Sequence, residues 1–210
     1  MYGGVDALFK SSAKAPIEAA VQEVESHTSA ELVVTACKMA GEYRDVDYLM
    51  GAVLALITLV ALLYLPTPFP LYVFPIDVAL GFAIGAGVGR QIRPLRRVLA
   101  GRERLSRAAQ QAAKAAFFDQ DVRRTADRTG ILVHIAGFER RVDVLADNGI
   151  DLRSLGEAWG RAQQELEEAV RRDDLDGFVR ALKGLGPLLA PSYPRGEDDV
   201  NELPDGLMTA

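Results

Sequence analysis

The residues best placed for chemistry form a short acidic run, Asp147, Asn148 and Asp151, after an apolar segment typical of a strand. Carboxylate and amide oxygens suit calcium, which takes about six to eight oxygen ligands. The run supplies about half of them, so the acidic loop after Cys37, residues 42–47, would have to contribute. An ordinary Asp-Asn-Gly turn followed by a helix cap explains the same residues without a metal.

Other catalytic arrangements are not visible in the sequence. It holds no glycine-rich phosphate loop, no nucleophile elbow and no His-Glu-x-x-His motif. His134 lies within an apolar segment, where a core histidine is expected, and Cys37 has no histidine near it in the chain to activate its thiol. A net charge of −5 argues against a nucleic-acid-binding surface, because such surfaces are basic.

Two apolar runs in the middle of the chain predict a transmembrane hairpin. They span residues 49–65 and 71–89, and each has about the length that a helix needs to cross a bilayer. Residues 66–70 between them include three prolines, which end the first helix and favour a reversal. We therefore assign residues 49–92 to the hairpin and its immediate flank. Asp77 lies inside it, either as a functional carboxylate or as one close enough to the interface to reach water.

The second run repeats a small residue at every fourth position, Gly81, Gly85 and Gly89. Such a face allows close helix packing in membranes. Its partner is either the first helix, through Gly51 and Ala55, or a second copy of the protein.

Basic residues flank the hairpin, and its turn has none. Those before it are Lys38 and Arg44, and those after it are Arg93, Arg96, Arg97, Arg102, Arg104 and Arg107. Because positive flanks mark the cytoplasmic side, both termini are predicted to be cytoplasmic. Alternatively, these arginines form the water-exposed face of a helix and do not report the membrane orientation.

The two flanks show the periodicities of one α/β domain. Strands are expected at 31–37, 131–136 and 141–146, with the last two as an antiparallel hairpin, and helices at 16–27, 105–118, 155–170 and 175–189. Neither flank is large enough to bury a core alone. We therefore expect a discontinuous domain of residues 1–48 and 93–190, with an acidic, flexible tail at 191–210.

Four segments of the flanks resemble the TPM-domain family. They are IEAAVQEVESHTSAELVVTAC, TGILVHIAGFERRVDVLADNGI at 129–150, EEAVRRDDLDGFVRALKGLGPLL and the tail sequence DDVNELPD. The resemblance implies an α/β/α sandwich with a small mixed sheet. Some members have been ascribed acid phosphatase activity or bind calcium, with acidic residues at strand ends. The matching metal positions here would be Asp147, Asp151 and Glu31.

The chain departs from the usual family pattern in its anchor. Typical members face away from the cytoplasm and carry a signal peptide or a terminal anchor, whereas this domain is split by its hairpin. It is similar to a bacterial subgroup of membrane proteins, which implies an inner-membrane location.

Two functions of different classes follow. The first is a membrane-anchored interaction or accessory module for a membrane complex or its assembly, bound to the bilayer and to a membrane protein or to its own copies through the hairpin. The second is a weak calcium-dependent hydrolase resembling an acid phosphatase. The first leads, because the sequence shows an anchor and no catalytic constellation.

Overall fold

The computed structural model describes residues 7–64, 70, 72–196, 203 and 207–209. The chain forms two compact units, one of Met1–Gly41 with Ser106–Ala210 and one of Glu42–Leu105. The second unit is wider than the predicted hairpin of residues 49–92 because it includes the loop before the first long helix and a short helix after the second.

A four-stranded mixed sheet in the order β3-β2-β1-β4 lies at the centre of the first unit. Its strands are β1 (Glu31–Cys37), β2 (Gly130–Ala136), β3 (Arg141–Ala146) and β4 (Met208–Thr209). β1 pairs in parallel with β2 and β4, and β2 pairs antiparallel with β3, as the sequence predicted for that hairpin. Every residue of β1 and β2 is buried, which explains their continuous apolar sequences.

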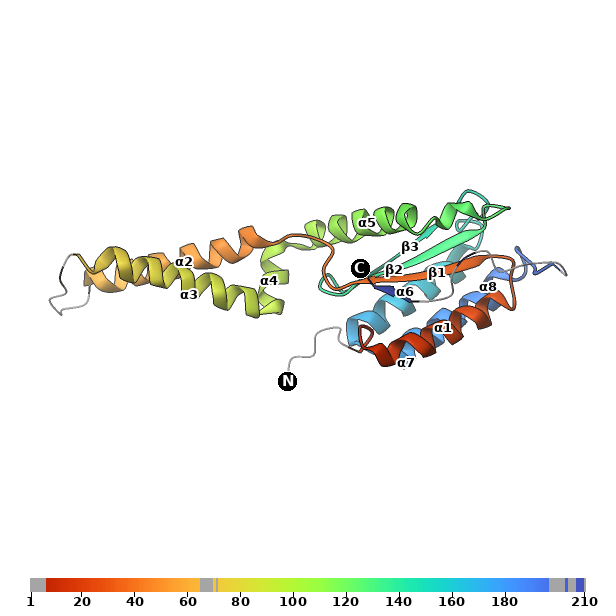
Figure 1. The fold of residues 1–210 in the computed structure, drawn as a ribbon, viewed down its shortest axis with the longest axis horizontal. Coiled ribbons are helices and arrows are strands. Elements are labelled where there is room, and N and C mark those ends of the chain that lie inside the picture. The colour runs from red at the N-terminus through yellow and green to blue at the C-terminus, as the bar shows by residue number, and fades with distance from the viewer. Residues whose placement is uncertain (1–6, 65–69, 71, 197–202, 204–206, 210) are drawn as a thin grey trace. The chain divides into compact units, whose positions relative to one another are not determined.

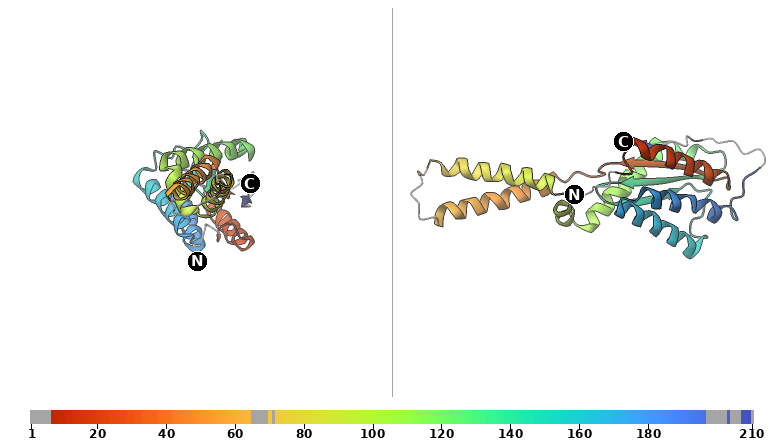
Figure 2. Two further views of the ribbon diagram at one scale, coloured as in Figure 1. Left: turned by 90° about the vertical axis from the view of Figure 1, so that its left-hand side faces the viewer. Right: turned by 90° about the horizontal axis from the view of Figure 1, so that it is seen from below.

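Helices cover both faces of this sheet (Figures 1 and 2). One face packs on α1 (Ser11–Glu25), α6 (Gly156–Arg172), α7 (Leu175–Lys183) and α8 (Leu185–Leu189) around one large apolar core. The other face packs on the first-unit part of α5 (Arg102–Asp119) and on the 3-10 turn η1 (Val122–Arg124). The predicted α/β class with a small mixed sheet is confirmed.

The tail contributes its end to the sheet. Met208 and Thr209 pair with Thr35 and Ala36 of β1, and Leu203 and Leu207 are buried. The acidic part of the tail, residues 197–202, lies outside the described residues. Its predicted flexibility stays a prediction.

The second unit holds α2 (Arg44–Tyr64), α3 (Phe74–Gln91) and α4 (Arg93–Ala100). α2 and α3 lie side by side along their length (Figures 1 and 2). Among the described residues, α2 is the one helix that is long and apolar enough to cross a membrane by length and composition. Residues 65–69 of the predicted turn lie outside the described residues.

Three of the four glycines of α3, Gly81, Gly85 and Gly89, face α2 and are buried. A Cβ atom at Gly85 would lie 2.7 Å from the Met50 carbonyl oxygen and 2.8 Å from Cβ of Leu54. A Cβ atom at Gly81 would lie 2.5 Å from the Thr58 hydroxyl oxygen. The small-residue face therefore contacts the first helix of the same chain, because only glycine leaves room for this close approach.

Candidate functional site

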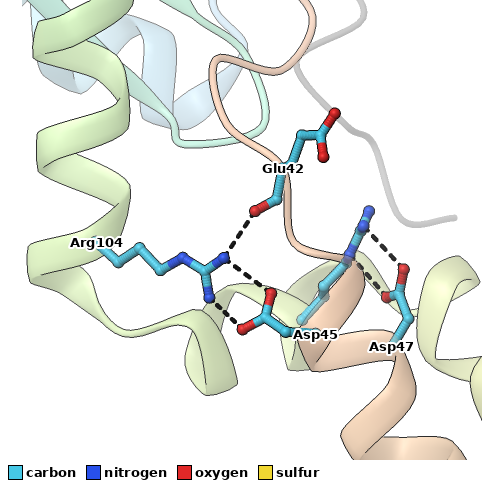
Figure 3. A network of polar contacts seen from close by, with 5 residues as sticks. Glu42, Asp45, Asp47 and Arg104 are labelled. Atoms are coloured by element: carbon cyan, nitrogen blue, oxygen red, sulfur yellow. Dashed lines mark hydrogen bonds and ion pairs between the residues drawn. The ribbon is translucent and has the colours of Figure 1, made fainter.

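The base of the hairpin holds a network of acidic and basic side chains (Figure 3). Asp47, in the first turn of α2, meets Arg96 of α4. Arg96 Nη2 donates to Asp47 Oδ2 at 2.9 Å, and Arg96 Nε lies 2.9 Å from Oδ1. Each side chain is 10% exposed, so the ion pair is largely removed from water. A buried pair of this kind fixes two helices together, since separating it would leave two unpaired charges.

A second, exposed pair joins Asp45 to Arg104 at the start of α5. Arg104 Nη2 donates to Asp45 Oδ1 and to the Glu42 carbonyl oxygen, each at 2.8 Å (Figure 3). The hydrogen bonds from Arg104 lower the pKa of the Asp45 carboxyl. The Arg104 guanidinium also lies 5.2 Å from the ring centroid of Tyr43, which is fully buried.

The hairpin base thus consists of Tyr43, Asp45, Asp47, Arg96 and Arg104. Its carboxylates are paired with guanidinium groups, so the loop after Cys37 does not offer Asp45 and Asp47 as calcium ligands. These ion pairs connect the first turn of α2 with α4 and with the start of α5.

A second polar group is buried in the sheet of the first unit. β1 and β2 pair so that Thr35 lies opposite His134. The Thr35 hydroxyl oxygen is 2.8 Å from His134 Nδ1, and Cys37 Sγ is 3.4 Å from His134 Nε2. Sequence reasoning missed this contact because 97 positions separate the cysteine and the histidine. Aligning the sequences of β1 and β2 as parallel neighbours would have placed Thr35 opposite His134, with Cys37 two positions further along.

This group does not have the electrostatics of an activated nucleophile. Burial, with the Glu139 carboxylate as a second cause, raises the pKa of the Cys37 thiol to about 11. Burial also lowers the pKa of His134. A nucleophilic pair needs a thiolate beside an imidazolium, and both shifts oppose that state. His134 is 2% exposed, which agrees with its interpretation as a core histidine.

Glu139 has a structural role that the sequence did not suggest. It lies in the turn between β2 and β3 and is 5% exposed. Its carboxylate accepts hydrogen bonds from the backbone N–H groups of Ala40 and Gly41, at 3.1 and 3.2 Å. It therefore fixes the end of the first unit just before the chain enters the hairpin.

The predicted metal residues make contacts with their own surroundings. Oδ1 of the buried Asp147 accepts from the N–H of Asn148, whereas its Oδ2 is buried without a hydrogen-bond partner in the described structure. Asp151 is exposed and accepts from the N–H of Arg153. Glu31 is buried at the start of β1. Within the described residues, no three His, Cys, Asp or Glu side chains are grouped so that they could hold a metal ion.

Comparison with known proteins identifies the fold alone. No family model matches the sequence, and no curated protein matches it. Among solved structures, the NMR structure of the BA42 protein from the psychrophilic bacterium Bizionia argentinensis is similar, with a TM-score of 0.56 and 14% identity. The similarity covers 96% of this chain and 94% of that one.

Proposed function

We propose that this chain is a membrane-anchored accessory module of the bacterial inner membrane. In this proposal α2 and α3 cross the bilayer as a hairpin, and a TPM-like α/β unit faces the cytoplasm with both termini. The module acts by binding a membrane protein complex or assisting its assembly.

The observation that carries the proposal is the two-sided character of the hairpin. Its inner side is closed by small residues, and its outer side is apolar and exposed. On α2, Leu56, Ile57 and Leu63 are 61, 57 and 63% exposed. On α3, Ile76, Leu80 and Ile84 are 64, 56 and 50% exposed. A water-soluble protein rarely leaves so much apolar surface uncovered, whereas lipid chains cover it without cost.

Asp77 fits this placement without a transport role. It lies in the first turn of α3, at the end of the hairpin next to the turn. The positive end of the helix dipole favours a carboxylate there. The Asp77 side chain would then extend only a short distance to the outer membrane surface, where water solvates the carboxylate.

An accessory role is favoured over catalysis by the state of the polar groups. The carboxylates at the hairpin base are neutralised by arginines, and the one thiol is buried with a raised pKa. Within the described residues these groups hold the structure together.

The anchor is tested by membrane fractionation of cells that express the full chain, followed by alkaline extraction. A reporter fused after residue 210 and one inserted at residue 67 give the topology. We expect retention in the extracted membrane, a cytoplasmic C-terminus and an external turn. Release of the chain by alkali would contradict the anchor. Crosslinking in intact membranes tests the accessory role, and recovery of the monomer with lipid alone would count against it.

A further inference from the structure

The short helix α4 exposes an apolar stripe at the base of the hairpin. Ile92, which precedes it, and Leu95, Val98 and Leu99 are 41, 37, 77 and 43% exposed. At about 100° per residue these four positions fall within one third of the helix circumference. Val98 is among the most exposed apolar residues of the described structure. A stripe of this kind on a helix of eight residues calls for a covering surface.

The same segment is rich in arginine and has no acidic residue. From Arg90 to Arg102, both included, the sequence has five arginines and no Asp or Glu. Arg96 is buried against Asp47, whereas Arg90, Arg93 and Arg102 are exposed. Exposed apolar residues beside exposed arginines are the features of a helix that lies in a membrane interface with anionic lipids.

The position of α4 suits such an interface. The Asp47–Arg96 pair holds α4 against the first turn of α2. α4 lies crosswise to the two long helices in both views (Figures 1 and 2). A helix crosswise to a membrane-spanning hairpin, at its base, lies parallel to the membrane plane.

We infer that α4 lies in the lipid headgroup layer on the side of the arginine flank. Its apolar stripe enters the upper acyl region, and Arg90, Arg93 and Arg102 bind the phosphates of anionic phospholipids. Guanidinium groups bind phosphate oxygens with paired N–H donors. The inference rests on the proposed membrane hairpin and adds a lipid class that the protein recognises.

The test uses the full chain with Cys37→Ala as background, reconstituted in bilayers of phosphatidylcholine alone or mixed with phosphatidylglycerol. One sample carries an environment-sensitive fluorophore at Val98→Cys and another at Leu56→Cys in the hairpin. Lipids brominated near the headgroup or deep in the chains then quench each label according to its depth. We expect shallow quenching at position 98 that increases with phosphatidylglycerol, and deep quenching at position 56 in both bilayers.

Charge dependence is tested with Arg90→Gln and Arg93→Gln combined in the Val98→Cys protein. In this variant we expect that phosphatidylglycerol no longer increases the shallow quenching of the label at position 98. The matched control replaces two exposed arginines of the α/β unit, Arg153→Gln with Arg161→Gln, and should keep it.

The outcomes separate this inference from the proposed function. A label at position 98 that stays in water in both bilayers, with position 56 quenched, overturns the lipid-binding helix and leaves the anchor intact. If phosphatidylglycerol still increases the shallow quenching at position 98 after Arg90→Gln with Arg93→Gln, these arginines do not bind the anionic lipid. If position 56 is not quenched, the hairpin is not in the bilayer and both proposals fail.

Discussion

Asp47 and Arg96 form a largely buried ion pair across 49 positions of sequence. The pair joins the start of α2 to α4, which follows α3 directly, and so closes the open end of the hairpin. Charge in this segment therefore has two roles. Arg96 is buried in the ion pair with Asp47, whereas Arg90, Arg93 and Arg102 are exposed.

Removing Arg96 should destabilise the hairpin base strongly. Arg96→Ala leaves the Asp47 carboxylate buried without its partner, which typically costs roughly 3–5 kcal/mol. Replacing both residues, Asp47→Leu with Arg96→Met, should recover most of that loss because no buried charge remains. Reversible unfolding of the full chain in detergent measures both variants. Arg104→Ala breaks the exposed pair and should cost clearly less; an equal loss would show that burial of the Asp47–Arg96 pair is not what matters.

Enlarging Gly85 should separate the two long helices. The Cβ and methyl groups of Gly85→Val would overlap the Met50 carbonyl oxygen and Leu54, and overpacking of this kind costs roughly 1–3 kcal/mol. Gly87→Val is the matched control, because a Cβ atom at Gly87 has nothing within 4 Å. Helix separation can be followed by the rate of disulfide formation between cysteines introduced on α2 and α3. Similar rates in the two variants would contradict this packing.

The Cys37 thiol should make the fold sensitive to alkali. Its pKa is raised from 9.0 to about 11, so the unfolded chain loses the thiol proton first as the pH rises. The unfolding free energy of the wild type should therefore fall between these two values more steeply than that of Cys37→Ala. Urea unfolding at several pH values above 8.5 measures the difference. Parallel pH profiles would mean that the thiol titrates normally in the folded chain.

Calcium should leave the melting temperature unchanged. Asp147 and Asp151 accept hydrogen bonds from neighbouring backbone N–H groups, and the described residues group no three ligands. Thermal melting of the full chain with calcium and with chelator tests this, because a ligand of the folded state raises the midpoint. A rise that disappears in Asp147→Asn with Asp151→Asn would restore the calcium site and make phosphatase assays the next step.

Most local elements of the α/β unit follow from sequence patterns alone, although the helix predicted at 175–189 is divided into α7 and α8. β1 has the bounds that its apolar run predicted, and the β2–β3 hairpin follows from two adjacent strand patterns with a short turn. Gly81, Gly85 and Gly89 of α3 were found from their spacing, since a repeat of four residues marks one helix face. These features depend on residues that are close together in the sequence, so the periodicity of the sequence predicts them.

Contacts between residues far apart in the sequence depend on the tertiary structure. Strand register places Thr35 and Cys37 beside His134, and helix packing selects Asp47 and Arg96 from many acidic and basic residues of the flanks. β4 has two residues, too few for a pattern, and exists because β1 offers a free edge. No local rule encodes such pairs, because their free energy depends on which surfaces the fold brings together.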